Sequence, residues 1–240
     1  MYAMRREGFV DNEGVHIHYM CMRMNPYDGV TIVVIPGMVE PAEEYENYFK
    51  NSPILNAVFI SIRGRGKSDA PDHGYSFEAQ LSDVSAVIEH LGLRSYIILG
   101  FSVGASFAIA HALKRPKQVQ GLVIVDYPPH YPSIPEGWIA AAMESGRDII
   151  PLRIARALVR ESDRVVMSRE LPMIQCPTLV VRGAKEGSLL PAEIAALYTD
   201  RIPQCTMLVL ENMGHDPFEI AGKDFMNILS AFERRVASGL

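Results

Sequence analysis

The stretch YIILGFSVGASFAIAHALKRP, residues 96–116, decides the fold of this chain. It begins as an apolar run typical of a buried strand and continues as a run typical of a helix, which ends in basic residues before Pro116. Ser102 lies between Gly100 and Gly104, where the first run gives way to the second. This Gly-x-Ser-x-Gly pattern fits either a nucleophile elbow, a strained strand-to-helix turn that exposes the serine, or an ordinary glycine turn.

The composition indicates one globular domain. The chain has 240 residues, of which 48% are hydrophobic and 8% aromatic, enough to bury a sizeable core. Its net charge of −5 argues against a nucleic-acid-binding protein, which would normally have a basic face. There is no apolar signal segment near the N-terminus and no run long enough to span a membrane. Cys21, Cys176 and Cys205 are widely spaced and odd in number, which is typical of free thiols in a reducing compartment. We therefore expect a soluble cytoplasmic protein with no membrane or nucleic-acid partner.

Short apolar runs alternate with amphipathic ones along most of the chain. Helices are predicted at residues 75–93, where Ser76 is a start signal, and at residues 105–115 and 223–237. The runs that predict strands are residues 16–24, 30–35, 57–62, 96–100, 122–126, 178–183 and 206–211. This alternation favours a mostly parallel sheet with helices on both faces.

One interval, residues 128–172, departs from the alternation. It has no strand signal, and two stretches within it, residues 136–143 and 150–161, are helix-like. Because so long a connection tends to be functional or to carry its own structure, we expect a helical lid inserted between two core parts, residues 1–127 and 173–240. His130 and Trp138 open this insertion and either line a pocket or have a structural role.

Four motifs follow predicted strands in order: VVIPGM, SIRGRGKSDAP, GFSVG and NMGHDPF. Together they resemble the α/β-hydrolase family across nearly the whole chain. The resemblance implies an α/β-hydrolase fold with a mostly parallel eight-stranded sheet, a site at the carboxyl ends of the strands, and the chain order serine, acid, histidine. It favours the elbow, with Ser102 as nucleophile, Gly100 and Gly104 allowing the close packing of the turn, and His215 as the base.

The same resemblance implies an oxyanion hole made by two backbone amides. They belong to Val103, directly after the serine, and to Met38, directly after Gly37. Many members have histidine before that glycine, whereas this chain has Pro36. Neither a metal nor another cofactor is expected, because His16 and His18 lack partners at metal-ligand spacing.

The third catalytic residue has two candidates. The commonest family pattern places an Asp after the strand that follows the lid, but the segment VVRGAKEGSLLP has none and offers Glu186 instead. Some esterases and lactonases of the family take the acid from the end of the preceding strand, which supplies Asp126 here. Neighbouring strands lie about 4.8 Å apart, so either carboxylate could reach one imidazole. We favour Asp126.

These residues predict a serine hydrolase that cleaves a small carboxylic ester through an acyl-enzyme intermediate. The same apparatus could serve a lactonase, a thioesterase or a hydrolase of C–C bonds. A non-catalytic ligand receptor on this fold is a further alternative from a different class, because fold does not imply function.

Overall fold

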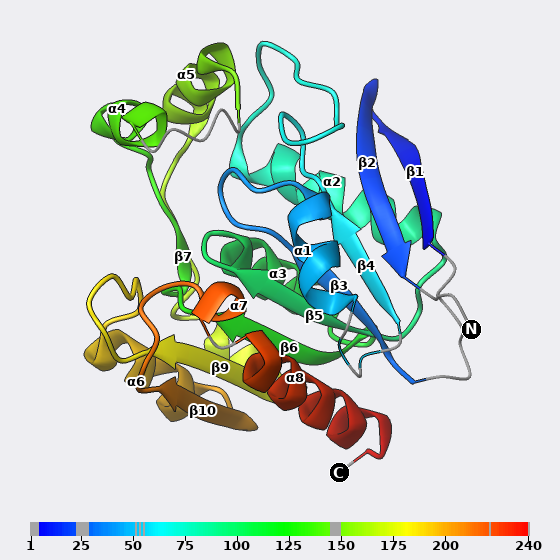
Figure 1. Ribbon diagram of the computed structural model, residues 1–240, viewed down its shortest axis with the longest axis vertical. Helices are drawn as coiled ribbons and strands as arrows, with labels where there is room; N and C mark the ends of the chain where they lie inside the picture. Colours follow the sequence, from blue (N-terminus) through cyan, green and yellow to red (C-terminus); the bar gives the residue numbers. More distant parts are fainter. Residues whose placement is uncertain are drawn as a thin grey trace.

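An eight-stranded sheet runs through the molecule, with helices on both of its faces (Figure 1). The computed structural model describes residues 5–22, 29–50, 52, 54, 56–144, 150–220 and 222–239. The strands in these residues are β1 (Arg5–Asn12), β2 (Val15–Met22), β3 (Thr31–Ile35), β4 (Ala57–Ile60), β5 (Tyr96–Phe101), β6 (Val119–Val125), β7 (His130–Tyr131), β8 (Val165–Val166), β9 (Thr178–Gly183) and β10 (Cys205–Leu210). The helices there are α1 (Ala42–Phe49), α2 (Phe77–His90), α3 (Gly104–Lys114), α4 (Gly137–Glu144), α5 (Leu152–Glu161), η1 (Leu171–Met173), α6 (Ala192–Arg201), α7 (Pro217–Ile220) and α8 (Gly222–Ala237).

The large sheet has the strand order β1-β2-β4-β3-β5-β6-β9-β10. From β4 to β10 the neighbouring strands pair in parallel, whereas β1 with β2 and β2 with β4 pair antiparallel. The predicted fold class, a mostly parallel eight-stranded α/β sheet, is confirmed. Because β5, β6, β9 and β10 are mutually parallel, their carboxyl ends meet at one edge of the sheet.

Each face of the sheet packs against its own helices, which explains the unbroken apolar strands. In β3, Val33 and Ile35 join the core formed with α2 and α3, while Ile32 and Val34 join the core formed with α1 and α8. All four side chains are buried. A strand covered on both faces must be apolar at every position, so it shows no alternation in the sequence.

Helix α2 begins where the capping signal predicts. The Oγ of Ser76 accepts a hydrogen bond from the amide of Ala79 at 3.2 Å, and so satisfies one of the donors that the first turn leaves free. The helices predicted at residues 105–115 and 223–237 are confirmed as α3 and α8.

Strand β1 was not predicted. Its sequence RREGFVDN is charged and has no apolar run, and it pairs in the sheet with β2. An edge strand is solvated along one side, so its sequence need not be apolar. Pairing with a neighbour, rather than local composition, decides its structure.

The segment at residues 128–172 contains α4 and α5, as predicted, and also the short antiparallel pair β7–β8. Each of these strands has two residues, which is too short for a period to show in the sequence. Helix α5 buries Ile154, Ala157 and Leu158 against Tyr75 of the core part. Figure 1 shows α4 and α5 beyond one end of the sheet. The lid boundaries themselves stay a prediction.

No helix within the described ranges combines the length and the apolar character that crossing a bilayer requires.

A buried histidine on α3 makes the stability of the fold depend on pH. His111 is 2% exposed, and its Nε2 lies 2.7 Å from the hydroxyl oxygen of Tyr96. Burial lowers the pKa of His111 from 6.5 to about 4, with smaller contributions from Arg115 and Lys114. Between these two values the unfolded chain binds a proton that the folded chain does not, so the free energy of unfolding falls as the pH is lowered.

We expect His111 to contribute a loss of about 2 kcal/mol between pH 7 and pH 4.5. The measurement is urea unfolding of wild type and His111→Gln at both pH values. The variant should lose less stability than wild type over this interval. His73→Gln, which changes an exposed histidine, is the control and should behave as wild type. Equal losses for wild type and His111→Gln would contradict the assignment.

Candidate active site

Ser102 occupies a sharp turn between β5, which ends at Phe101, and α3, which begins at Gly104. Its φ of +52° lies in the left-handed region that non-glycine residues rarely adopt. The Ser102 amide donates to the carbonyl of Val125 at 3.0 Å, which holds the turn to the end of β6. Such strain costs about 1–3 kcal/mol and concentrates at functional sites. The turn has the strand-to-helix geometry of a nucleophile elbow.

The two glycines that flank the turn lie where backbone segments approach one another closely. A Cβ on Gly100 would overlap the Cα of Ala105, and a Cβ on Gly104 would overlap the carbonyl oxygen of Pro36. These neighbours are backbone atoms, which cannot move aside as a flexible side chain can. Glycine at both positions therefore lets α3 start directly against the loop that follows β3.

Replacing Gly104 by alanine should destabilise the protein by about 3 kcal/mol, the upper end of the usual cost of overpacking. The measurement is the free energy of unfolding in urea. Gly137→Ala is the matched control, because a Cβ at Gly137 meets no atom within 4 Å. The control should stay within about 0.5 kcal/mol of wild type. If Gly104→Ala were as stable as wild type, the loop after β3 would have to move aside for the added Cβ, and the prediction would be wrong.

Asp126 directly follows β6 and is fully buried. Its Oδ2 lies 2.8 Å from Nδ1 of His215, in the loop after β10. The carboxylate also accepts hydrogen bonds from the Ser188 hydroxyl at 2.6 Å, the Leu189 amide at 2.8 Å and the Gly183 amide at 3.1 Å. These donors fix the orientation of the carboxylate and compensate for its burial.

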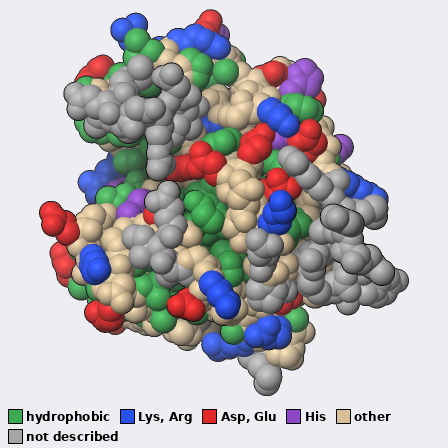
Figure 2. Space-filling model, viewed as in Figure 1, with side chains coloured by type: hydrophobic (Ala, Val, Ile, Leu, Met, Phe, Trp, Pro, Cys, Tyr) green, Lys and Arg blue, Asp and Glu red, His purple; other side chains and the backbone are tan. Residues whose placement is uncertain are grey.

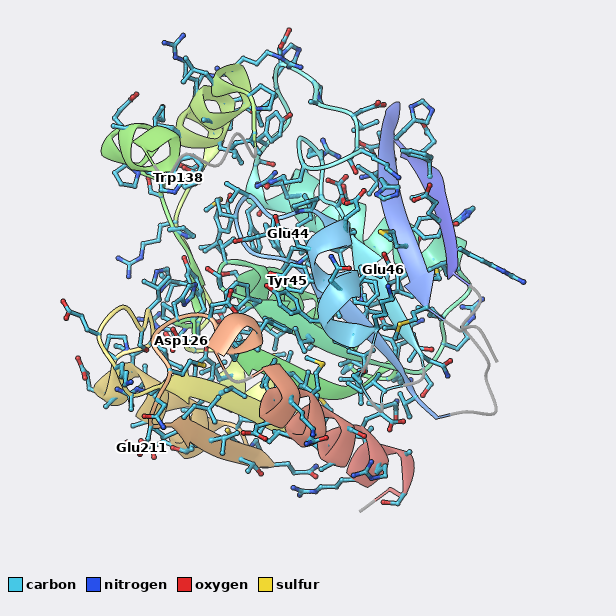
Figure 3. The ribbon with its side chains drawn as sticks, in the orientation of Figure 1. Glu44, Tyr45, Glu46, Asp126, Trp138 and Glu211 are labelled. Carbon is cyan, nitrogen blue, oxygen red and sulfur yellow. The ribbon has the colours of Figure 1, made fainter. Side chains whose placement is uncertain are left out.

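The imidazole of His215 lies beside the strand that leads to Ser102. Its ring stacks on that of Phe101, with centroids 4.9 Å apart and an angle of 30° between the planes. The side chain is 27% exposed, whereas Asp126 behind it is inaccessible. Figure 3 labels Asp126 at the end of β6, beside α7 in this view. The structure thus brings the elbow, the imidazole and one carboxylate to the same edge of the sheet.

Glu186, the alternative acid, lies in the loop after β9 and is exposed. Its backbone carbonyl, rather than its carboxylate, approaches the histidine loop: a Cβ on Gly214 would lie 2.8 Å from the Glu186 oxygen. Among the described residues, His215 has a hydrogen bond to Asp126 and none to Glu186. Geometry therefore pairs the imidazole with Asp126.

Met38 and Val103, the expected oxyanion donors, stand in loops that touch. Met38 follows β3 by three residues, and Val103 is the N-cap of α3, whose first residue packs against Pro36. In the described part of the chain, neither amide donates to a protein acceptor.

Two charged side chains beside these loops were not predicted as part of the site. The Glu40 carboxylate folds back over Gly37, and its Oε2 is buried without a hydrogen-bond partner among the described residues. Burial raises the pKa of Glu40, and the charge of His215 opposes this rise. Arg65 donates from Nε to the carbonyl of Met38 at 2.8 Å. The only sequence signal for either residue is its place in a loop after a strand end.

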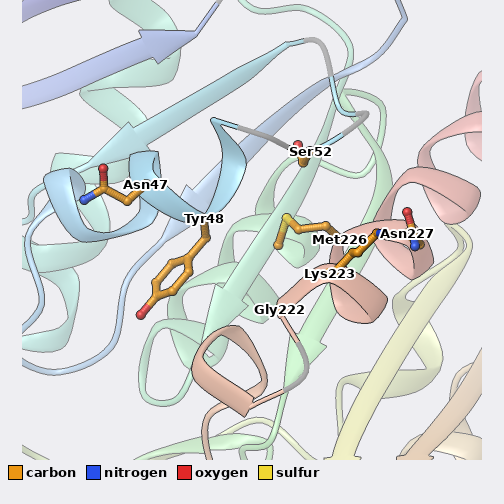
Figure 4. A pocket seen from close by; sticks show the side chains of 7 residues that line it. All are labelled: Asn47, Tyr48, Ser52, Gly222, Lys223, Met226 and Asn227. Atoms are coloured by element: carbon orange, nitrogen blue, oxygen red, sulfur yellow. The ribbon is translucent and has the colours of Figure 1, made fainter.

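Two surface hollows lie within the described residues, and the second shares Leu189, a donor to Asp126, with this cluster. A groove of about 480 Å³ between α1 and α8 is lined by Asn47, Tyr48, Ser52, Gly222, Lys223, Met226 and Asn227 (Figure 4). A mainly apolar pocket of about 350 Å³ is lined by Pro128, Pro129, His130, Arg164, Val166, Ser168, Leu189, Pro191, Ile194 and Leu197. His130 thus lines a pocket, whereas Trp138 packs against the apolar cluster around Tyr75. Figure 2 shows the molecule indented between the part that carries α4 and α5 and the part that carries β9 and β10.

The two histidines of β2 have other partners. His16 Nδ1 lies 2.8 Å from Asp69, and His18 lies 3.5 Å from Glu7 and 3.7 Å from Glu43. Over the described ranges, no group of three or more His, Cys, Asp or Glu side chains is arranged to hold a metal ion.

Comparison with known proteins identifies the class. A model of the alpha/beta hydrolase fold family matches residues 31–157, more than half of the chain, and the chain belongs to this family. The resemblance in the motifs is thereby confirmed, and the protein is a hydrolase of this fold.

Two curated relatives cover most of the chain. The N-formylmaleamate deformylase of Pseudomonas putida is 28% identical, over 92% of this chain and 96% of its own length. The 2-(acetamidomethylene)succinate hydrolase of Mesorhizobium japonicum is 25% identical, over 74% of this chain and 78% of its own length.

Solved structures share the fold. A thermophilic esterase from Thermogutta terrifontis superposes with a TM-score of 0.79 at 20% identity, covering 97% of this chain and 99% of that one. An esterase from Exiguobacterium antarcticum gives 0.75 at 20% identity, covering 94% and 98%. At this identity the likeness concerns the fold alone.

Proposed function

We propose that the protein is a serine hydrolase that cleaves carboxylic esters through an acyl-enzyme intermediate. The observation that carries this proposal is the hydrogen bond of 2.8 Å between Asp126 and His215, beside a strained serine turn. A buried carboxylate bound to one imidazole nitrogen leaves the other nitrogen free to act as a base.

In the acylation step, the Oγ of Ser102 attacks the carbonyl carbon while Nε2 of His215 accepts its proton. The carbonyl oxygen becomes an oxyanion, which the amides of Met38 and Val103 stabilise. Asp126 holds the imidazole in the tautomer that carries its proton on Nδ1 and stabilises the imidazolium that forms. His215 then returns the proton to the leaving alcohol, and the C–O bond breaks.

In the deacylation step, water replaces the serine as nucleophile. His215 accepts a proton from the water, the hydroxide adds to the acyl carbon, and the second oxyanion uses the same two amides. The proton goes to Ser102 as the acid is released. The proposed apparatus needs no metal or other cofactor, because each proton has a protein carrier.

Amide hydrolysis is the second candidate. The observation that favours it is the similarity to a deformylase and to an acetamido-compound hydrolase, of which the first matches over nearly its whole length. The chemistry differs only in the leaving group, which is an amine and needs protonation by His215 before it departs. Lactones, thioesters and C–C bonds remain alternatives with the same triad, and a non-catalytic receptor would show no turnover at all.

The test compares a matched ester and amide, 4-nitrophenyl acetate and 4-nitroacetanilide. The ester should give the larger kcat/KM, and rapid quenching should reveal an acetyl group on the peptide that contains Ser102. A larger kcat/KM for the amide would establish the second candidate instead. Failure to turn over any member of an ester, lactone, thioester and amide panel would overturn the proposal of a serine hydrolase.

A further inference from the structure

Arg65 is a buried cation without an anionic partner beside the candidate active site. Its side chain is 2% exposed. Nε donates to the carbonyl of Met38 at 2.8 Å, Nη1 donates to the carbonyl of Arg63 at 2.7 Å, and Nη2 lies 3.9 Å from the sulfur of Met38. All of these partners are neutral. Among the described residues Arg65 has no ion pair, and the charges of Asp83, which is paired with Arg63, and of Glu40 act on it only from beyond ion-pair distance.

The charge of the neighbouring Arg63, in contrast, is compensated by a carboxylate. Arg63 binds both carboxylate oxygens of Asp83, with Nε 2.8 Å from Oδ2 and Nη2 2.7 Å from Oδ1. Asp83 is thus occupied by Arg63. A guanidinium has five N–H donors, and the contacts of Arg65 use three of them, one on a weakly accepting sulfur.

Further buried polar groups without a partner lie around Arg65. The hydroxyl of Tyr75 and Oε1 of Gln80 have no hydrogen-bond partner among the described residues, although both side chains are fully buried. The hydroxyl of Tyr131 accepts a hydrogen bond from Gln80 at 2.9 Å. Burial raises the pKa of Tyr75 to about 12, and the charge of Arg65 is the strongest influence against this rise. The Tyr75 hydroxyl also lies beside Gly64, the residue before Arg65, since a Cβ on Gly64 would be 2.9 Å from its oxygen.

A buried charge without a counterion strongly destabilises the folded protein. A buried hydroxyl without a hydrogen-bond partner destabilises it to a smaller degree. A bound anion would relieve both costs at once. The planar guanidinium suits a carboxylate, which can accept two parallel hydrogen bonds, and the Tyr75 hydroxyl can donate a third.

We propose that Arg65 and Tyr75 form a carboxylate subsite, so that the substrates of this hydrolase carry a carboxylate in addition to the bond that is cleaved. This inference rests on the proposed function, because it concerns the same site. Arg65 binds the carbonyl of Met38, the residue whose amide is the proposed oxyanion donor. In such a substrate only a few atoms would therefore separate the carboxylate from the carbonyl that Ser102 attacks. The packing of Met38, Ile154 and Tyr75 in one cluster places the subsite between the core and α5.

The experiment uses two esters of equal length, 4-nitrophenyl hemisuccinate and 4-nitrophenyl pentanoate, which differ in the terminal carboxylate. Wild type should have the larger kcat/KM for the anionic ester. In Arg65→Met the ratio of the two kcat/KM values should fall by about 30-fold, the effect of one charged hydrogen bond of about 2 kcal/mol. Tyr75→Phe should lower the same ratio by a smaller factor. Arg153→Gln removes an exposed cation of α5 and should leave the ratio unchanged.

A parallel loss for both esters would overturn the proposal, because an arginine that only positions the Met38 loop affects every substrate alike. If Arg65→Met does not fold, wild type supplies the test. Succinate should inhibit hydrolysis of the neutral ester competitively and far better than succinamide does at equal ionic strength, and equal inhibition would again overturn the subsite. If the proposed function itself were wrong, wild type would hydrolyse neither ester, and this result differs from every outcome that would overturn the subsite alone.

Discussion

Replacing Ser102 by alanine should lower kcat by about 10⁶-fold, as removal of the nucleophile does in a well-studied serine protease. The reason is chemical rather than structural, because alanine keeps the backbone and the Cβ of the turn but has no oxygen to form the acyl-enzyme. A fluorophosphonate probe should label wild type once and should not label Ser102→Ala.

The matched control is Ser106→Ala. Ser106 lies one turn further along α3, and its hydroxyl donates to the carbonyl of His130 at 2.6 Å. This variant should lose some stability and keep its labelling, because it does not contribute to the proposed site. Labelling of Ser102→Ala at the wild-type rate would refute the assignment of the nucleophile.

Replacing Asp126 by asparagine should lower kcat by about 10⁴-fold. Asparagine has nearly the same shape, but its amide favours the wrong imidazole tautomer and removes the charge that stabilises the imidazolium. Here it would also face the donors of Ser188, Leu189 and Gly183, which are arranged for a carboxylate. The measurement is kcat for a chromogenic ester, with circular dichroism to show that the fold is retained.

Glu186→Gln is the comparison for this prediction. Its side chain is exposed and has no hydrogen bond to His215 among the described residues, so the variant should stay within a small factor of wild type. If both single variants lost activity moderately and the double variant lost more, the two carboxylates would share the role. A crippled Glu186→Gln beside a fully active, folded Asp126→Asn would assign the acid to Glu186.

Local sequence was sufficient to predict the central strands and the turn at Ser102. Strands covered on both faces must be apolar throughout, as Val33 and Val34 are, so their runs are visible without a structure. Gly100 and Gly104 mark the tight turn in the sequence, because the approach of other backbone atoms leaves no room for a side chain at either position. Edge strand β1 had no such constraint and was missed.

The sequence by itself determined the central strands, the helices α2, α3, α4, α5 and α8, the place of the serine turn and two candidates for the acid. Only the tertiary structure decided that His215 meets Asp126 rather than Glu186, because that choice depends on how two neighbouring strand ends and a loop from a third strand are oriented. The same holds for Arg63 and Arg65. They stand two residues apart in one motif, yet only Arg63 faces Asp83 of α2, while Arg65 lies beside Met38 with its charge unpaired. Side-chain direction and burial are set by packing between distant segments, and local sequence does not contain them.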